Sequence, residues 1–259
     1  MKNFTLDEWI EWQCKLHSTN MDFNLSRIKE VAVRLNIGKT KSKVFTIAGT
    51  NGKGSTVAIL ESILIESGYS VGSYTSPHLL EFNERIKINK IPASTKEICN
   101  AFEIIEESRK DITLTYFEFS TLAAFIIFSQ KKLDILILEV GLGGRLDAVN
   151  IIDSDVSVIT NIGLDHTSIL GSNMEKIALE KSGVMRKYKP TIVGYSGVHD
   201  SIIKYSNEVD ATLSIFNKHF SGKIYNGKKW IFENIDGVRI EFEYPGIRGD
   251  IQINNAATA

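Results

Sequence analysis

The sequence is poor in cysteine and has no excess of charge of either sign. Its two cysteines, Cys14 and Cys99, lie far apart in the chain and match no metal-binding or redox spacing, which is typical of a protein in a reducing compartment. We expect both thiols to be buried. Thirty basic and thirty-one acidic residues give a formal net charge of -1. The composition therefore does not indicate nucleic acid or an anionic membrane as a partner.

Long apolar runs are also missing. No segment approaches the roughly 18 apolar residues of a membrane-spanning helix. The N-terminal stretch MKNFTLDEWIEWQ is acidic and aromatic, where a secretion signal is basic and then apolar. We therefore expect a cytoplasmic protein. Of the 259 residues, 43% are hydrophobic and 24% are charged, which predicts one large globular domain, alone or with a small appendage.

Helical and strand-like patterns alternate along the chain. Helical patterns cover residues 6–16, 25–35, 55–67, 94–109, 118–131 and 174–187, and strand-like runs cover residues 43–49, 134–141, 155–163 and 190–195. Near-continuous apolar strands between helices predict an α/β fold with a mostly parallel sheet and helices on both faces. Ligands of such sheets bind beyond the carboxyl ends of the strands. Residues 211–244 contain shorter β-like pieces around YNGKK and ENIDG, which predict hairpins in a small β-rich appendage.

The segment TIAGTNGKGST, residues 46–56, joins an apolar strand to a helical pattern through a glycine-rich bend. Such a bend points backbone N–H groups inward, the helix N-terminus favours negative charge, and Lys53 adds a full positive charge. The segment departs from the common pattern GxxxxGK[ST], because Ile47 stands at the first glycine and Gly54 follows the lysine. We interpret it as a nucleotide phosphate loop. The alternative is an ordinary glycine-rich turn between a strand and a helix.

The segment GTNGKGS resembles the ATP-binding loop of the Mur ligase superfamily, and a glycine after the lysine is typical of its dihydrofolate synthase and folylpolyglutamate synthase branch. Further segments resemble that family in its order. They are SYTSPHLLEFNERI (73–86), LTYFEFSTLAAF (114–125), LILEVGLGGRLDAVN (136–150), ITNIGLDHTSILG (159–171) and IALEKSGVMR (177–186). The resemblance implies that ATP binds to Gly49, Thr50, Asn51, Gly52, Lys53, Gly54, Ser55, Thr56 and, through its adenine, Asn255.

The same resemblance divides the chain into four parts. We expect an N-terminal helical segment at 1–40, a P-loop core of the Mur ligase type at 41–210, the β-rich appendage at 211–250, and the start of a further helix at 251–259.

Glu139 is a candidate magnesium ligand. It follows the apolar strand DILIL and precedes a glycine-rich turn, so its carboxylate falls at a carboxyl strand end, where a phosphate-bound Mg²⁺ needs an oxygen ligand. A solvent-facing glutamate is the alternative. Asp165 and His166 follow another strand, although a lone histidine is more often structural. The resemblance implies that Ser76 completes the first site and that His166 binds a second Mg²⁺. Taken alone, Ser76 before Pro77 is a turn signal.

Lys181 stands in a helical pattern whose default interpretation is a solvated face. The resemblance implies that CO₂ converts its amine to a carbamate near the metals. An ammonium group beside two Mg²⁺ ions would be repelled, whereas a buried lysine of lowered pKa can react as the free amine.

Three segments resemble the family's contacts with dihydropteroate. They are Asp22, Phe23 and Asn24; Thr115, Tyr116, Phe117 and Glu118; and Leu146, Asp147 and Ala148. Related enzymes can have glycine where this chain has Asn24. A core role for Phe117 and a helix-start role for Glu118, where the helix dipole favours an acid, are the alternatives.

The resemblance implies a monomeric ligase of folate biosynthesis and one-carbon metabolism. It would join L-glutamate to 7,8-dihydropteroate, or extend the glutamate chain of a folate, through an acyl phosphate formed from ATP. Lys53, His166 and Lys181 would be its catalytic residues. A nucleotide-binding module that has lost catalysis is the rival hypothesis. A peptidoglycan Mur ligase fits less well, because those enzymes usually have Ser or Thr after the loop lysine and lack the TSPHL and TYFE segments.

The chain ends at QINNAATA, whereas family members continue into a Rossmann-like domain with the glutamate site. It is either a fragment or a natural short protein. Because a ligase must hold its second substrate against the acyl phosphate, we expect these residues alone to bind ATP but to ligate slowly or not at all. Glutamate-dependent ADP release at the family's ordinary rate would contradict this expectation.

Overall fold

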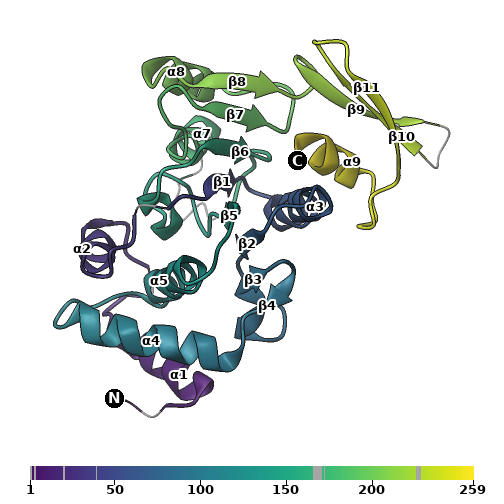
Figure 1. Ribbon diagram of the computed structural model, residues 1–259. Coiled ribbons are helices and arrows are strands. Elements are labelled where there is room, and N and C mark those ends of the chain that lie inside the picture. Colours follow the sequence, from purple (N-terminus) through teal and green to yellow (C-terminus); the bar gives the residue numbers. More distant parts are fainter. Residues whose placement is uncertain are drawn as a thin grey trace.

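An eight-stranded sheet forms the centre of the protein, with the strand order β4-β3-β2-β5-β1-β6-β7-β8 (Figure 1). The computed structural model describes residue 2 and residues 4–19, 21–38, 40–165, 171, 173–225 and 229–259. The strands of this sheet are β1 (Lys43–Ala48), β2 (Val71–Tyr74), β3 (Ile86–Ile88), β4 (Ile91–Pro92), β5 (Ile135–Glu139), β6 (Val156–Ile159), β7 (Pro190–Val193) and β8 (Thr212–Ile215). All neighbouring pairs from β2 to β8 are parallel, and β3 and β4 add an antiparallel edge.

The register of the central strands brings their carboxyl ends together. Ile47 of β1 is opposite Glu139 of β5 and opposite Val158 of β6. Every residue of β5 is buried, which agrees with the near-continuous apolar run expected for a strand covered on both faces. The segments that follow β1, β5 and β6 therefore begin at one edge of the sheet, as the sequence predicts.

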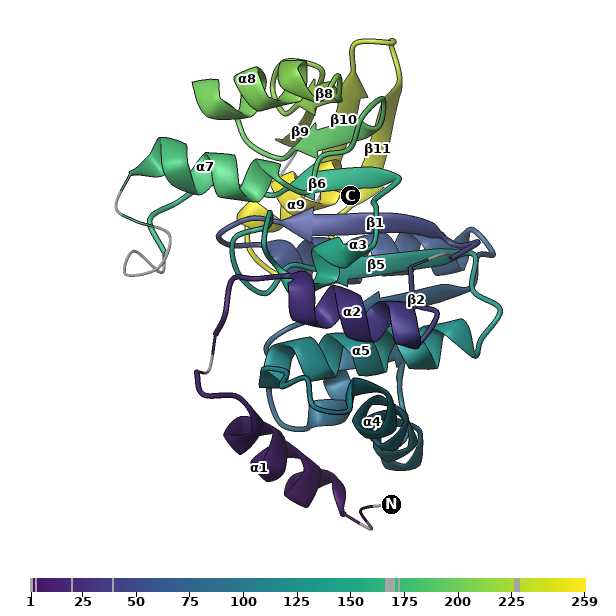
Figure 2. The same cartoon turned by 90° about the vertical axis from the view of Figure 1, so that its left-hand side faces the viewer.

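Helices cover both faces of the sheet. Figures 1 and 2 show α3 on one face, and α2 and α5 on the other. Residues 118–128 of α5 are buried throughout and most of them are apolar, so this helix lies inside the core. The helices are α1 (Leu6–Leu16), α2 (Ser26–Arg34), α3 (Lys53–Glu66), α4 (Thr95–Arg109), α5 (Tyr116–Ser129), α7 (Met174–Ser182), α8 (Asp200–Glu208) and α9 (Ile251–Thr258), with short 3₁₀ helices η1 (Phe82–Arg85) and η2 (Ala148–Ile151).

Aromatic packing attaches α1 to the core. The buried ring of Trp9 lies 5.8 Å from the ring of Phe102 on α4 and 6.3 Å from the ring of Phe119 on α5, measured between centroids. Thr5 and Glu8 form a reciprocal capping box at the start of the helix. These interactions fix the side of α1 that faces α5.

Two boundaries differ from the sequence prediction. The helix α7 ends at Ser182, before the predicted residue 187, and Gly183 is its C-cap. A β-carbon at Gly183 would lie 2.3 Å from the Arg145 Cβ, so the close packing of the two segments requires glycine. The strand β8 pairs with β7 and belongs to the large sheet. The core sheet therefore continues past the boundary predicted at residue 210. The strands β2, β3 and β4 and the helix α8 were not predicted.

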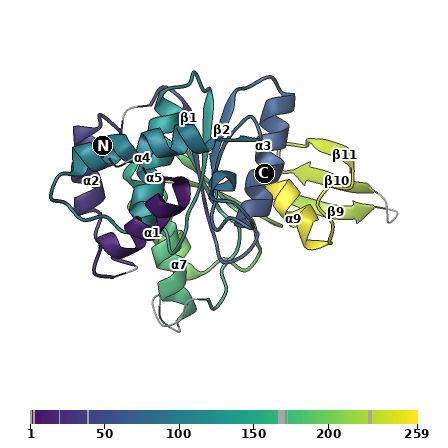
Figure 3. The same ribbon diagram turned by 90° about the horizontal axis from the view of Figure 1, so that it is seen from below.

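A three-stranded antiparallel sheet forms the appendage, with the order β11-β10-β9. Its strands are β9 (Phe220–Tyr225), β10 (Lys229–Asn234) and β11 (Arg239–Glu243). Figure 3 shows α9 between this sheet and α3. Trp230 packs with Ile253 and Ala257 of α9 in a small separate core. The hairpin character predicted for residues 211–244 is confirmed for this sheet.

The expectation of buried thiols is wrong. Cys14 is exposed and Cys99 is half-buried, and both are free. The face that α1 buries carries Trp9 and Gln13, so Cys14 falls on the neighbouring side of the helix. None of the helices in the described ranges is long and apolar enough to cross a membrane.

Candidate active site

The phosphate loop leaves β1 through two glycines that other residues could not replace. Gly49 has φ +147°, and a β-carbon there would lie 1.9 Å from the Thr160 Oγ1. Gly52 has φ +81°, and its β-carbon would lie 2.7 Å from the Asn255 Oδ1. Only glycine combines these backbone conformations with so close an approach. The loop is therefore fitted between the end of β6 and α9 before α3 begins at Lys53.

Two lysine amines meet on one backbone carbonyl in this loop. The Lys53 Nζ donates hydrogen bonds to the carbonyl oxygens of Gly49, at 3.1 Å, and Thr50, at 3.2 Å. The Lys181 Nζ, from α7, donates to the same Gly49 oxygen at 2.9 Å. The two amines are thus gathered at the carboxyl end of β1, where a polyphosphate chain would need cations.

The residues after β6 hold the loop in shape. The Thr50 N–H donates to the Asn161 carbonyl at 3.1 Å, and the Asn51 N–H donates to the Asn161 Oδ1 at 2.8 Å. The Thr160 hydroxyl donates to the Asn51 carbonyl at 2.6 Å. No role was predicted for Thr160 or Asn161, although both are polar residues directly after an apolar strand, as Glu139 is after the apolar run DILIL.

Glu139 and Ser76 lie together at the end of β5, as the sequence predicts. The Ser76 N–H donates to the Glu139 Oε2 at 3.2 Å. Glu139 is only 5% exposed, and burial raises the pKa of its carboxyl to about 7 against the effect of the Lys53 charge. The alternative of a solvent-facing glutamate is wrong.

Asp147 is a second buried acid at this edge. Its carboxylate accepts N–H bonds from Leu142, at 2.9 Å, and Val149, at 3.0 Å. Burial nevertheless raises the pKa of Asp147 to about 6. Since neighbouring N–H donors favour the ionised form, desolvation is the larger effect here.

Lys181 is 4% exposed, so the default interpretation of a solvated helix face is wrong. Burial, together with the Lys53 charge, lowers the pKa of its amine to about 8. A larger fraction of Lys181 is therefore the neutral, nucleophilic amine than for a lysine in water.

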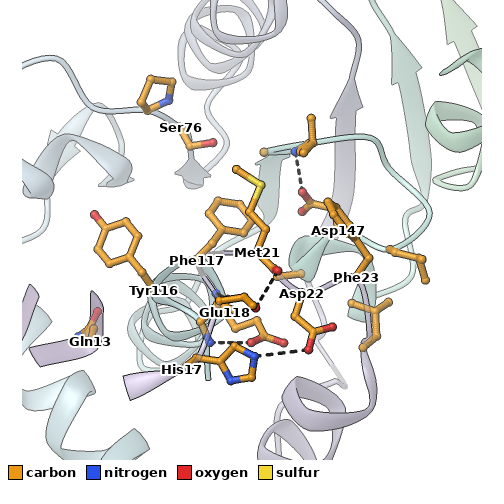
Figure 4. A pocket seen from close by; sticks show the side chains of 18 of the residues that line it. Gln13, His17, Met21, Asp22, Phe23, Ser76, Tyr116, Phe117, Glu118 and Asp147 are labelled. Carbon is orange, nitrogen blue, oxygen red and sulfur yellow. Dashed lines mark hydrogen bonds and ion pairs between the residues drawn. The ribbon is translucent and has the colours of Figure 1, made fainter. Parts of the chain in front are cut away.

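A cavity of about 710 Å³ opens beside the loop (Figure 4). Its lining includes Lys53, Ser76 and Asp165 from the phosphate-loop side of the sheet. Of the predicted substrate residues, those that line it are Asp22, Phe23, Thr115, Tyr116, Phe117, Glu118, Leu146, Asp147 and Ala148. Asn24 is described but does not line the cavity, because its Oδ1 accepts the Ser26 N–H at 2.9 Å near the start of α2.

An arginine that the sequence analysis missed joins two walls of the cavity. Arg27 on α2 forms ion pairs with Asp22 and with Glu118, the latter at 3.1 Å. The His17 Nε2 lies 3.4 Å from the Asp22 Oδ2. Glu118 also accepts the Thr115 N–H at 2.8 Å, so it caps α5 and pairs with Arg27 at once. The alternative of a helix-start role for Glu118 is confirmed, and Glu118 also lines the cavity.

Arg85 was missed as well. It is buried, lines the cavity and donates from Nε to the His78 Nδ1 at 2.8 Å. Its guanidinium carbon lies 5.3 Å from the centroid of the Tyr116 ring, within range of a cation–π interaction. Burial and the charge of Arg85 lower the pKa of His78. Arg85 and His78 lie in the family segment at residues 73–86, but the resemblance assigned neither of them a role.

The predicted second metal ligand, His166, lies outside the described residues. Within the described ranges, no group of three or more His, Cys, Asp or Glu side chains could hold a metal ion. The pair of Ser76 and Glu139 fits a magnesium ion that takes its remaining oxygen ligands from phosphate and water. The metal assignments stay predictions.

The Mur ligase middle domain family matches residues 47–259. The dihydrofolate synthase/folylpolyglutamate synthase of Buchnera aphidicola from Acyrthosiphon pisum is 49% identical over 212 residues, which are 82% of this chain and 51% of the relative. The chain belongs to the dihydrofolate synthase/folylpolyglutamate synthase family of Mur ligases. It spans about half of the length of this curated relative.

Two solved structures of family members match closely. Escherichia coli FolC in complex with DHPP and ADP gives a TM-score of 0.94 at 40% identity, over 99% of this chain and 62% of that one. The Yersinia pestis bifunctional folylpolyglutamate synthase/dihydrofolate synthase, complexed with AMPPNP and a Mn ion, gives 0.90 at 42% identity over the same shares. The α/β fold expected for the family is confirmed.

A pair of glycine variants tests the fit of the loop. We expect Gly49→Ala to lower the free energy of unfolding by at least about 1–3 kcal/mol, the size of backbone strain alone, with the Thr160 clash in addition. Gly54→Ala is the matched control, since its β-carbon would lie 3.8 Å from its nearest neighbour, the Glu139 Oε2. Urea unfolding of both variants measures the difference, and equal stability would contradict the geometry.

The buried carboxyl of Glu139 predicts a pH dependence of stability. Its pKa rises from the ordinary 4.5 to about 7, so between these values the folded protein keeps a proton that the unfolded chain releases. Stability is therefore lost as the pH rises through this window. Without metal and nucleotide, Glu139→Gln should match the wild type near pH 4 and exceed it above pH 7, on the order of 3 kcal/mol. Denaturant unfolding across this range provides the measurement. A constant difference at all pH values would contradict the prediction.

Proposed function

We propose that the protein is an ATP-dependent ligase that joins L-glutamate to 7,8-dihydropteroate or to the glutamate chain of a folate. One observation carries the proposal. Lys53 and Ser76 line the same cavity as nine predicted substrate residues, so the phosphate loop and the proposed acid-binding cavity share one edge of the sheet. The complexes of family members with DHPP, with ADP and with AMPPNP and manganese support it.

The reaction must activate a carboxylate, because its oxygen is a poor leaving group. In the proposed first step, an oxygen of the acid attacks the γ-phosphorus of ATP, and ADP leaves. Lys53 then exchanges its two loop carbonyls for phosphate oxygens and balances their charge. Glu139, Ser76 and His166 would hold divalent ions, which supply further charge neutralisation when bound.

In the second step the free amine of glutamate attacks the carbonyl carbon of the acyl phosphate. A tetrahedral intermediate collapses to the amide, phosphate leaves and the nitrogen loses a proton. Asp147 and Ala148, beside Phe117 and Tyr116, would orient the acid so that its carboxylate faces Lys53. The buried site excludes water that would hydrolyse the acyl phosphate.

Lys181 enters the proposal as a carbamate. Its neutral amine would add to CO₂, with loss of one proton, and form an anion that would lie near the divalent ions. The support is its burial and the lowered pKa of about 8. We further propose that the protein acts in the cytoplasm as a monomer.

The test is a coupled ADP-release assay on the full-length gene product, with glutamate and either dihydropteroate or tetrahydrofolate. We expect ADP release only with both an acid and glutamate. Release without either acid, or none with both, would contradict a ligase, and nucleotide binding without turnover would favour the nucleotide-binding module that has lost catalysis.

Replacement of the loop lysine tests its role. Lys53→Ala should lower kcat/KM by roughly 10²–10³-fold, because a preorganised cation is lost at the transferring phosphate. Lys43→Ala at the opposite end of β1 is the control, since Lys43 is exposed and pairs with Asp155. Unchanged turnover by Lys53→Ala would remove the phosphate loop from the mechanism.

A further inference from the structure

Gln13 on α1 is a buried polar side chain whose hydrogen bonds are missing. It is 1% exposed, and neither its Nε2 nor its Oε1 has a partner among the described residues. Buried carboxamides in folded proteins nearly always have partners. Gln13 also lines the cavity.

The surroundings of Gln13 are those of a binding surface. His17 follows one turn later on the same face of α1 and also lines the cavity. The His17 ring is held from both sides, by the Thr113 Oγ1 at 2.8 Å and by Asp22. It is therefore not available to satisfy the Gln13 amide. Tyr116 faces the cavity from the start of α5.

Gln13 lies away from the phosphate end of the cavity. Figure 4 shows Ser76 and Gln13 well apart, with the Tyr116 ring between them in this view. The carboxylate of an acid substrate must approach Lys53 and Ser76. An extended aromatic acid bound in this direction therefore brings its opposite end toward α1.

We propose that Gln13 is a specificity-determining residue, whose carboxamide recognises the lactam edge of a fused heteroaromatic ring at the far end of the acid substrate. A carboxamide complements a lactam, since its Nε2 donates to the ring carbonyl while its Oε1 accepts from the ring N–H. Such a pair of hydrogen bonds gives a partner to both the Nε2 and the Oε1 of Gln13. The inference rests on the proposed function and identifies Gln13 as the residue that recognises the ring of the acid substrate.

The test compares binding of two acids by isothermal calorimetry to the intact protein with ADP present. The probes are 7,8-dihydropteroate and its analogue methylated at the lactam nitrogen, which has no N–H to donate. The wild type should prefer the unmethylated acid by roughly tenfold. Gln13→Leu should bind dihydropteroate roughly tenfold more weakly and lose most of that preference, with its affinity for ADP unchanged. Gln13→Met, an unbranched replacement, should give the same affinities as Gln13→Leu.

Thermal unfolding separates recognition from structure. Without ligand, Gln13→Leu should raise Tm, because it removes an unpaired buried amide. Thr191→Val on β7 is the matched control: its hydroxyl is equally buried and without a partner in the described chain, but it does not line the cavity. It should raise Tm and leave both affinities unchanged.

The outcomes are distinct. Equal binding and equal preference in the wild type and both Gln13 variants would overturn the inference and leave the ligase proposal intact. A wild type that binds neither acid would overturn the proposed function, and the inference with it.

Discussion

The carbonyl oxygen of Gly49 is the point on which the arrangement of charge depends. It accepts hydrogen bonds from both Lys53 and Lys181, which come from different helices on different segments of the chain. It can do so because Gly49 takes a conformation that brings it against Thr160, without a β-carbon in the way. The loop, α7 and the end of β6 are therefore fitted to one another at a single backbone atom.

The site holds groups that are unfavourable in the free protein. Glu139, Asp147 and Lys181 are buried, and burial moves the pKa of each toward its neutral form. Gln13 is buried without partners among the described residues. Polyphosphate, divalent ions and an aromatic acid would each satisfy one of these groups. The protein thus gives up stability at the positions where its proposed ligands bind.

Sequence patterns predicted the elements that are regular and the residues at strand ends. The alternation of apolar strands and helices gave the parallel sheet, and the position of Glu139 after DILIL placed it beside Ser76. The contacts of Arg27 with Glu118 and of Arg85 with Tyr116 could not be predicted in this way, because each joins segments that are distant in sequence. The burial of Lys181 was also hidden, since the pattern of α7 contains no sign of the loop that covers it. The family resemblance, rather than periodicity, identified that lysine.

The closeness of Asn255 to Gly52 joins the C-terminal helix α9 to the loop after β1, two segments that are far apart in the sequence. A contact of such long sequence separation forms late, because the intervening chain must be ordered first. During synthesis the sheet and its helices emerge from the ribosome before α9 does. The loop after β1 can therefore contact α9 only after the other elements have emerged. The contact between Gly52 and Asn255 consequently forms only after nearly all of these residues have been translated.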